Sequence, residues 1–180
     1  MKNKEIELKF IITEKQKKLI LEHLNKNAKF LSKMQQIDTY YIPFYKNFEE
    51  NGETMECLRI RECDGKNILC YKKIHRECRP VYCDEFELEI ASKEQMEKIL
   101  FAIGFSVQMV IDKTRESFVS NDYEFDLDSV NDKLYLFEVE LKSDGDDVNK
   151  IYSFVSNFGL REKDVTYDGI QKLVKNIKVD

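Results

Sequence analysis

Charged side chains alternate with apolar ones in several short stretches of this chain. Because every second residue of a β-strand points to the same face, a period of two predicts strands that each carry one charged face. Like charges two residues apart repel each other unless a group of opposite sign lies between them. Some stretches repeat carboxylates and others repeat guanidinium or ammonium groups, a combination that suits a site for metal ions and a polyanion. The stretches are Glu5–Lys9, Leu58–Arg61, Glu85–Glu89, Phe125–Asp128 and Phe137–Leu141.

The composition limits the classes of partner. The 180 residues, of which 42% are hydrophobic, are enough for one sizeable core, so we expect a single domain over residues 1–180. The net charge of -5 argues against general binding of nucleic acid or of anionic membranes, because both need a basic surface. No apolar run approaches the roughly 20 residues of a membrane span. Any site for a polyanion must therefore be local.

The cysteines indicate the redox environment. They are odd in number and form no Cys-x-x-Cys pair, so we expect neither a disulfide framework nor a tetrahedral zinc site. Reduced thiols favour a cytoplasmic protein. The cysteines are Cys57, Cys63, Cys70, Cys78 and Cys83.

Periodicity and capping residues predict the helices and strands. Thr13 with Gln16, and Ser92 with Gln95, have the spacing that opens a capped helix, and Asp64-Gly65 is a dipeptide typical of hairpin turns. Helices are expected over about 13–28, 92–104 and 146–158, and from Thr166 onward. Strands are expected near 3–12, 34–42, 56–62, 67–74, 81–90, 106–112, 114–120, 123–129 and 135–142.

This order of elements predicts an α+β fold in which amphipathic helices cover the apolar face of an antiparallel sheet. An open sheet would leave the charged face in solvent. A closed barrel of about eight strands would instead enclose that face in a tunnel with room for side chains and one ligand. Burial of so many charges requires that they pair with one another or bind metal and anion.

The N-terminal block Glu5-x-Glu7-x-Lys9 resembles the Glu-x-Glu-x-Lys signature of the CYTH superfamily, the triphosphate tunnel metalloenzymes. Further blocks follow in the family's order, so the resemblance spans nearly the whole chain. Residues 38–48 followed by 56–61 are similar to the class IV adenylate cyclase branch, whereas thiamine triphosphatases share only the start of that stretch. The resemblance implies a closed antiparallel β-barrel, a tunnel of about eight strands with a charged interior. The further blocks are Gln36–Tyr41, Glu56–Arg61, Leu69–Lys72, Glu85–Glu87, Asp112–Arg115, Asp126–Asp128 and Phe137–Glu140.

The resemblance assigns basic residues of the strands to the triphosphate. Arginine offers phosphate oxygens a two-pronged donor, and lysine offers a point charge. Lys9, Lys72 and Arg115 are the implied catalytic residues. Inside a closed tunnel, the guanidinium groups of Arg59, Arg61 and Arg115 are expected to have no alternative partner; the alternative is that these are ordinary solvated strand faces. The implied triphosphate-binding set is Lys9, Arg59, Arg61, Lys72, Lys113 and Arg115.

The resemblance likewise assigns carboxylates to Mg²⁺ or Mn²⁺, hard ions that bind a few carboxylates together with phosphate and water oxygens. Glu7 and Glu140 are the first choices. Asp128 could join them, and the alternative for this residue is a position that faces a turn. The glutamates of 85–89 are expected to orient the basic residues through ion pairs. The implied metal-binding set is Glu5, Glu7, Asp126, Glu138 and Glu140.

Several functions are compatible with these residues. In a class IV adenylate cyclase the 3′-hydroxyl of ATP attacks the α-phosphorus and pyrophosphate leaves, whereas in an inorganic tripolyphosphatase or a thiamine triphosphatase water attacks the terminal phosphorus. A non-catalytic polyphosphate- or nucleotide-binding module is the third hypothesis, although such a module needs no metal ligands. Exposed apolar strands would also allow a homodimer. The chain departs from the family pattern where Lys73–His75 replaces Gly-Pro, beside the expected substrate.

Overall fold

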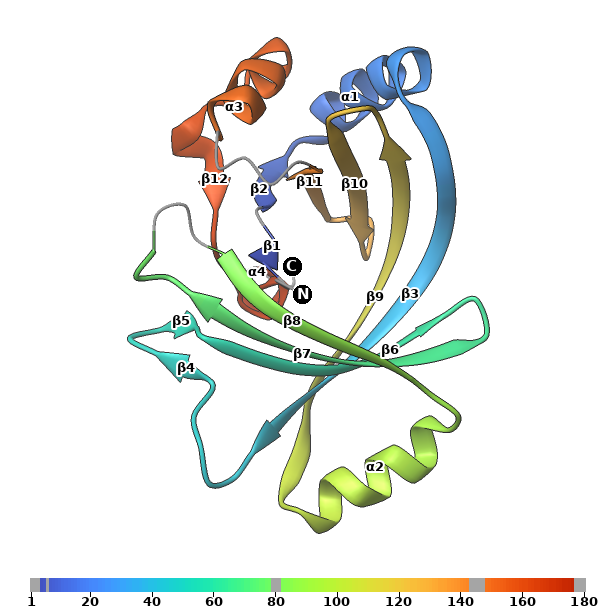
Figure 1. The fold of residues 1–180 in the computed structure, drawn as a ribbon, viewed down its shortest axis with the longest axis vertical. Helices are drawn as coiled ribbons and strands as arrows, with labels where there is room; N and C mark the ends of the chain where they lie inside the picture. Colours follow the sequence, from blue (N-terminus) through green and yellow to red (C-terminus); the bar gives the residue numbers. More distant parts are fainter. Residues whose placement is uncertain (1–3, 6, 79–81, 143–147, 177–180) are drawn as a thin grey trace. The chain divides into compact units, whose positions relative to one another are not determined.

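The protein has an α+β fold, seen in a computed structural model that describes residues 4–5, 7–78, 82–142 and 148–176 (Figure 1). The side chains of residues 4 and 5 lie outside this description. The chain forms two compact units. Unit 1 comprises residues 1–5, 35–112 and 168–180, and unit 2 comprises residues 6–34 and 113–167.

Two long strands belong to both units. They are β3 (Lys29–Pro43) and β9 (Phe105–Val119), which are neighbours in the strand order. The sequence predicts two separate strands where β9 is continuous, and this prediction is wrong. The polar pair Asp112-Lys113 does not interrupt the backbone, because Lys113 pairs with Val130 in the sheet and Asp112 accepts a hydrogen bond from the Gln35 side chain.

In unit 1 the strands follow the order β1-β8-β7-β6-β3, and every recorded pair is antiparallel. The β6–β7 hairpin turns at Asp64-Gly65 as predicted, because both residues have the positive φ angles, 51° and 72°, that this turn requires. The bounds are β1 Lys4–Glu5, β6 Glu56–Cys63, β7 Lys66–His75 and β8 Tyr82–Ile90, with a small hairpin of β4 Glu49–Glu50 and β5 Glu53–Thr54. Helix α4 is Ile170–Asn176.

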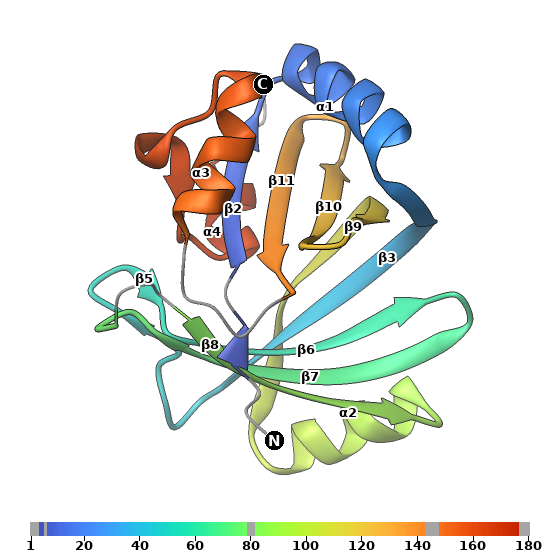
Figure 2. The same ribbon diagram turned by 45° about the horizontal axis from the view of Figure 1, so that its top comes forward.

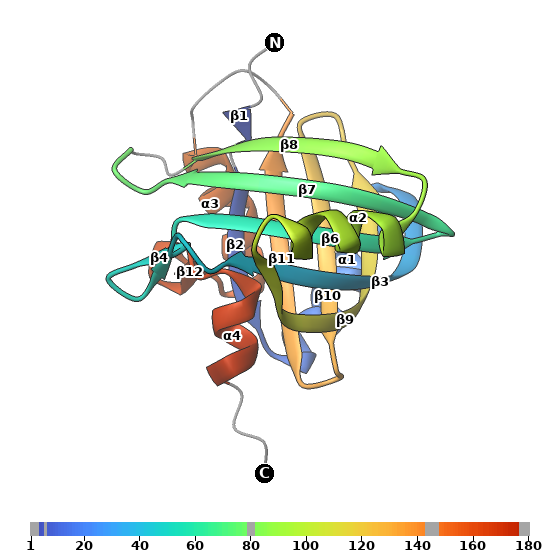
Figure 3. The same ribbon diagram turned by 90° about the horizontal axis from the view of Figure 1, so that it is seen from below.

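Helix α2 (Lys93–Ala102) covers the apolar face of unit 1 (Figure 3). The predicted cap is confirmed, because Ser92 Oγ accepts the backbone N–H of Gln95. Beyond the helix, Gly104 has a φ of 92°, a backbone conformation that residues with a side chain rarely adopt, so this position favours glycine. The apolar cluster under α2 contains Tyr41, Phe48, Leu58, Ile60, Ile90 and Leu100.

In unit 2 the strands follow the order β9-β10-β11-β2-β12. The bounds are β2 Glu7–Ile12, β10 Tyr123–Val130, β11 Leu134–Leu141 and β12 Val165–Thr166. Helices α1 (Glu14–Asn27) and α3 (Asn149–Val155) cover the apolar face, to which they contribute Ile20, Leu24, Ile151 and Val155 (Figure 2). Two short 3₁₀ helices follow α3, at Ser156–Phe158 and Glu162–Asp164.

The start of α1 confirms the predicted capping box. Thr13 Oγ1 accepts the N–H of Gln16, and Gln16 Oε1 accepts the N–H of Thr13. The prediction that Thr166 caps the last helix is wrong. Thr166 instead pairs with Lys9 in the sheet, and α4 begins four residues later.

The predicted first strand is divided between the units. Its start, β1, pairs with β8 in unit 1, whereas β2 pairs with β11 and β12 in unit 2. Strand β3 begins at Lys29, five residues before the predicted start at 34.

The predicted alternation of charged and buried apolar residues is confirmed on β2 and, with Leu58 and Ile60, on β6, whereas Phe86 and Leu88 of β8 are exposed. In unit 2, Glu7 and Lys9 alternate with the core residues Leu8 and Phe10. Among the described residues, no helix combines the length and hydropathy that crossing a bilayer requires. The five cysteines are present as thiols.

Candidate functional site

Unit 2 gathers carboxylates on the face of its sheet opposite α1 and α3. Strand pairing places Glu140 directly opposite Glu7 and Glu138 directly opposite both Asp126 and Lys9. Directly opposed like charges destabilise a sheet unless a cation lies between them. The register therefore creates positions for cations on this face.

Arg115 lies between several of these carboxylates. Its Nη1 contacts Asp126 Oδ2 at 2.5 Å and its Nη2 contacts Glu138 Oε2 at 2.5 Å. It also forms a bidentate pair with Asp128, with both distances 2.7 Å. The expectation that Arg115 has no alternative partner is wrong, because register brings three carboxylates to it.

The lysines of this face are also engaged. Lys113 Nζ lies 2.5 Å from Asp128 Oδ2, and Lys9 Nζ lies 3.0 Å from Glu138 Oε1. Asp128 is 1% exposed, so it does not face a turn, and it holds Lys113 and Arg115. The register places Asp126 on the same face as Asp128.

The protonation of this face follows from burial and neighbouring charge. Burial alone would raise the pKa of Glu138, but Lys9, Arg115 and Lys113 hold it well below its usual value. Burial would also raise the pKa of Asp128, but the positive charge of Arg115 lowers it overall. Burial raises the pKa of Asp126 against the pull of Arg115. Glu138 and Asp128 are therefore ionised at neutral pH.

In unit 2 the candidate metal ligands are an opposed pair rather than a ready cluster, because the one group of three possible ligands found among the described residues lies in unit 1. Glu7 and Glu140 are opposed in the sheet, and Lys9 Nζ lies 3.4 Å from Glu7 Oε1. An ion that binds oxygen ligands, such as Mg²⁺ or Mn²⁺, would relieve the repulsion of this pair. Glu5 lies in β1, paired with Cys83, and its side chain is outside the described part of the chain.

Unit 1 gathers arginines on the face of its sheet opposite α2. Arg61 donates from Nε and Nη2 to the two oxygens of Asp38, at 2.7 and 2.9 Å. The expectation that Arg61 has no alternative partner is therefore wrong as well. Asp38 is 0% exposed, and it lies opposite Arg61 in the β3–β6 pairing. This bidentate pair fixes the position of the Arg61 guanidinium.

Arg59 differs from the other two arginines. Its guanidinium nitrogens lie 3.7 Å from Asp38, 3.8 Å from Glu85 and 3.9 Å from Glu87, beyond hydrogen-bond length. Its Nε is buried and has no hydrogen-bond partner among the described residues. Burial opposes the charged form, but Tyr40 and Asp38 raise the pKa of Arg59, so it remains a cation. Arg59 thus has donor capacity left for an anion.

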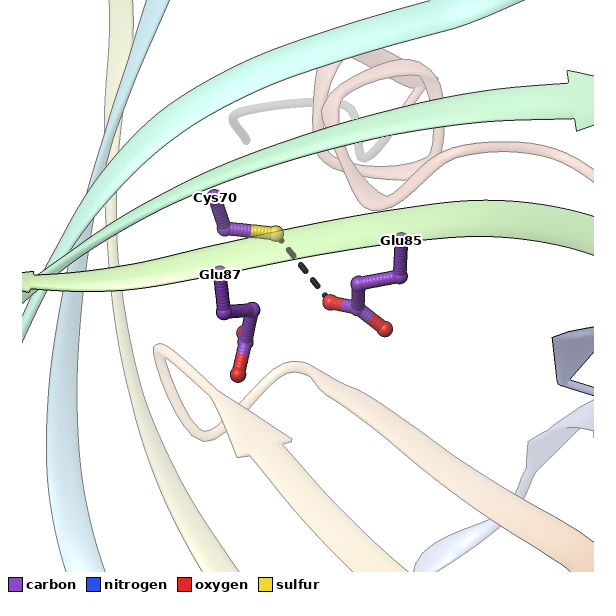
Figure 4. A group of neighbouring side chains, drawn as sticks. All are labelled: Cys70, Glu85 and Glu87. Carbon is purple, nitrogen blue, oxygen red and sulfur yellow. Dashed lines mark hydrogen bonds between the residues drawn. The ribbon is translucent and has the colours of Figure 1, made fainter. Parts of the chain in front are cut away.

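The glutamates of β8 orient basic residues, as predicted. Lys72 Nζ lies 2.7 Å from Glu85 Oε2, and Lys66 Nζ lies 3.0 Å from Glu89 Oε2. Glu85 and Glu87 also form, with Cys70, a group of potential metal donors (Figure 4). Burial raises the pKa of the Cys70 thiol, which donates to Glu85 Oε1 at 3.1 Å, so no thiolate is present. Because Lys72 pairs with Glu85 at 2.7 Å and the Arg59 guanidinium lies within 4 Å of both glutamates, these carboxylates support cations of the protein rather than form a metal site.

The structure thus divides the predicted residues between two faces. Unit 1 brings together the triphosphate-binding candidates Arg59, Arg61 and Lys72, and unit 2 brings together the rest of the described set. Sequence reasoning missed the role of Asp38, although its alternation with Tyr40 placed it on the charged face. The residues of unit 2 are Glu7, Lys9, Lys113, Arg115, Asp126, Glu138 and Glu140.

The chain matches a known family model. The model of the CYTH domain matches residues 3–166. A protein of Methanocaldococcus jannaschii named "Putative adenylate cyclase MJ0240" is 31% identical over 176 residues, which cover 97% of this chain and 90% of that protein.

Solved structures share the fold. The PH1012 protein of Pyrococcus horikoshii is 28% identical with a TM-score of 0.73, over 90% of this chain and 94% of that one. A Hippeastrum protein, described as a "putative adenylyl cyclase" with a dominant triphosphatase activity, has a TM-score of 0.64 over 87% of each chain. At 16% identity, the second likeness shows the fold alone.

Proposed function

Because the chain belongs to the CYTH domain family, we propose that it is a divalent-metal-dependent enzyme that acts on a small-molecule triphosphate. The first reaction proposed is that of a class IV adenylate cyclase, which converts ATP to cyclic AMP and pyrophosphate. The name of the M. jannaschii relative supports this reaction. The alternative is hydrolysis of inorganic tripolyphosphate or thiamine triphosphate, because the same fold has a dominant triphosphatase activity in the Hippeastrum protein.

The observation that carries the proposal is the unpartnered Nε of Arg59 among the described residues. A buried arginine with an unpartnered Nε and only long contacts to carboxylates costs free energy in the protein alone. A phosphate group would satisfy that donor, because its oxygens accept charge-assisted hydrogen bonds from arginine. Lys72, on the neighbouring strand, supplies a second positive charge.

In this proposal the residues of unit 1 hold the phosphate chain. Asp38 holds Arg61 in place through a bidentate pair, so the guanidinium is already oriented before the substrate binds. Preorganised cations stabilise the charge that develops on phosphate oxygens during displacement without reorganising at the moment of reaction. Arg61 and Lys72 would therefore act on the transition state as well as on binding.

The residues of unit 2 would hold the metal and the remaining phosphate charge. Glu7 and Glu140 would bind Mg²⁺ or Mn²⁺, together with Glu138, Asp126 and Glu5. When bound, such an ion supplies charge neutralisation for the triphosphate. Lys9, Lys113 and Arg115 would hold phosphate oxygens, with Lys9 and Arg115 acting as catalytic residues, and Asp128 would keep Arg115 in position.

No nucleophile from the protein is needed for either reaction. In the cyclase reaction, a bond forms between the ribose 3′-oxygen and the α-phosphorus, the bond to the β-phosphate oxygen breaks, and the hydroxyl proton is released. Positioning and electrostatic stabilisation supply the acceleration of such an in-line displacement. In the hydrolase reaction, water attacks the terminal phosphorus, the bond from that phosphorus to the bridging oxygen breaks, and orthophosphate and the shortened phosphate chain are released.

The remaining expectations belong to the same proposal. They are a single domain, closure of the sheet into a tunnel of about eight strands, a cytoplasmic location, no nucleic-acid or membrane partner, and a homodimer through exposed apolar strands.

Product analysis tests the function. The pure protein is incubated with ATP, tripolyphosphate or thiamine triphosphate, each with Mg²⁺ or Mn²⁺, and the products are separated. Cyclic AMP with pyrophosphate supports the cyclase, and orthophosphate supports the triphosphatase. Thermal stabilisation by tripolyphosphate without any turnover would instead support the non-catalytic binding module.

A further inference from the structure

Two buried side-chain atoms have no hydrogen-bond partner in the part of the chain that the structure describes. They are Gln36 Oε1 and Arg59 Nε, both in unit 1. The large majority of buried polar side-chain atoms in native proteins are hydrogen-bonded, because an unsatisfied group costs its desolvation free energy. A phosphate of the proposed substrate would provide the partner of Arg59 Nε. Gln36 requires a different partner.

Gln36 lies on the same face of unit 1 as the arginines. Gln36, Asp38 and Tyr40 alternate along β3, and their partners on β6 are Cys63, Arg61 and Arg59 in turn. Gln36 is 5% exposed, and the adjacent Asp38 is fully buried. Gln36 Oε1 therefore lies on the same face as the Asp38–Arg61 pair, two residues before Asp38 along β3.

The chemistry of the two unpartnered atoms differs. Arg59 Nε is a donor, which a phosphate oxygen satisfies. In the amide orientation of the structure Gln36 presents the acceptor Oε1, and an ionised phosphate chain offers acceptors only, so inorganic tripolyphosphate would leave this atom unsatisfied. A ligand that satisfies both atoms must combine an anionic phosphate chain with a neutral N–H or O–H group. Nucleoside triphosphates have this combination in the amino group of the base and the hydroxyls of the ribose.

We propose that Gln36 is a specificity-determining residue that accepts a hydrogen bond from an N–H or O–H group of the nucleoside part of the substrate. This inference rests on the proposed triphosphate chemistry and extends it, because it distinguishes nucleoside triphosphates from inorganic polyphosphate. A site that leaves a buried acceptor unpaired discriminates strongly against substrates without the donor.

The test compares Gln36→Met with Gln35→Met. Methionine has nearly the shape of glutamine but lacks the acceptor. Gln35 is the matched control, because it is exposed and its amide donates to Asp112 on the opposite face of β3. Each variant and the wild type are measured with ATP, inosine triphosphate, 3′-deoxy-ATP and tripolyphosphate, both by kcat/KM and by the melting-temperature shift on binding.

We expect Gln36→Met to lower kcat/KM for ATP by about 10- to 100-fold and to leave the melting-temperature shift with tripolyphosphate unchanged. The wild type should lose a similar factor with one analogue: inosine triphosphate if the donor is the base amino group, or 3′-deoxy-ATP, scored by its melting-temperature shift, if it is the ribose hydroxyl. With that analogue, Gln36→Met should cause no further loss. The unliganded variant should melt at the wild-type temperature or slightly above, because an unsatisfied buried acceptor has been removed.

Other outcomes overturn the inference. Equal losses with ATP and tripolyphosphate, or a lower melting temperature without ligand, would show that Gln36 has a structural partner such as a buried water. If Gln35→Met lowered kcat/KM for ATP as much as Gln36→Met, the loss would come from disturbance of strand β3 and not from removal of the Gln36 acceptor. A wild type that binds neither tripolyphosphate nor ATP contradicts the proposed function itself, whereas binding of tripolyphosphate without preference for ATP contradicts only the role of Gln36.

Discussion

The charged faces of the two units are built from the same kinds of side chain but are balanced differently. In unit 2, Arg115 contacts Asp126, Asp128 and Glu138 at 2.5 to 2.7 Å, and Glu7 and Glu140 oppose each other nearby in the register. In unit 1, Arg61 is held by Asp38 at 2.7 Å, whereas Arg59 has contacts of 3.7 Å or more and an unpartnered Nε.

The difference indicates opposite ligands. A face on which carboxylates outnumber cations is stabilised by a further cation, and a face with an unsatisfied guanidinium is stabilised by an anion. A substrate that is a metal complex of a triphosphate carries both charges. The comparison therefore predicts that mutations in the two units have different effects on metal use, anion binding and stability.

Loss of the carboxylates proposed to bind metal should have the largest effect. We expect EDTA, Glu7→Gln or Glu140→Gln to abolish turnover while the fold is retained, because each removes an oxygen ligand or the ion itself. Removal of the repulsion between the opposed glutamates should raise the melting temperature of the metal-free protein slightly. Turnover and melting curves check both effects.

A matched control for these variants is Glu116→Gln. Glu116 lies on β9 next to Arg115 but on the other face, where Lys33 is 3.4 Å away. Its activity should equal that of the wild type. Full activity in Glu7→Gln or Glu140→Gln would refute the assignment of metal binding to unit 2.

Arg59→Ala should have the next largest effect. A phosphate charge without its donor costs about 2 to 4 kcal/mol of transition-state stabilisation, so kcat/KM should fall by roughly two orders of magnitude or more. The melting-temperature shift on adding tripolyphosphate should disappear. The unliganded variant should keep its stability, because the contacts of Arg59 with carboxylates are long.

Lys66→Ala is the control for Arg59→Ala. Lys66 is an exposed cation of unit 1 whose partner, Glu89, is also exposed, so its ion pair contributes little. A tripolyphosphate shift in Arg59→Ala equal to that of the wild type would show that this face does not bind the phosphates.

Arg61→Ala should differ from Arg59→Ala in stability. Removal of Arg61 leaves the fully buried Asp38 without its bidentate partner, which should cost about 3 to 5 kcal/mol of the free energy of unfolding. Denaturant unfolding of the two variants measures the difference. The double variant Arg61→Leu with Asp38→Leu should recover most of the loss. Equal stability of the two single variants would contradict the distinction between a paired and an unsatisfied arginine.

The last prediction concerns acid, which should lower the free energy of unfolding through the charged face of unit 2. The pKa values of Glu138 and Asp128 are lowered in the folded state below the ordinary values of 4.5 and 3.8. The stability that these carboxylates contribute is therefore fully present above those values and is lost as pH falls toward the lowered folded-state values. Unfolding of the metal-free protein as a function of pH tests this.

Glu138→Gln provides the comparison in that experiment. The variant should show a shallower loss of stability in acid, because one of the carboxylates with a lowered pKa is absent. An unchanged acid dependence would mean that the ion pairs of unit 2 do not stabilise the fold.

Features that depend on neighbouring residues were predictable from the sequence. The capping box of Thr13 and Gln16 and the hairpin turn at Asp64-Gly65 form as predicted, because hydrogen bonds and φ angles within a few residues define them. The charged and apolar faces of the strands follow from the same local alternation. Thr166 was misassigned because its partner, Lys9, is far away in the sequence.

The sequence by itself determined the α+β class, the alternating faces and the family, because these depend on residue types, their spacing and the order of motifs. Only the tertiary structure decided which charges neutralise each other. Arg61 meets Asp38 through the pairing of β3 with β6, Arg115 meets Asp128 through the register of the β9–β10 hairpin, and Arg59 is left with a free donor. The register between strands depends on the packing of the whole sheet. A period of two is the same for a paired and an unpaired arginine, so it does not predict which carboxylate an arginine meets.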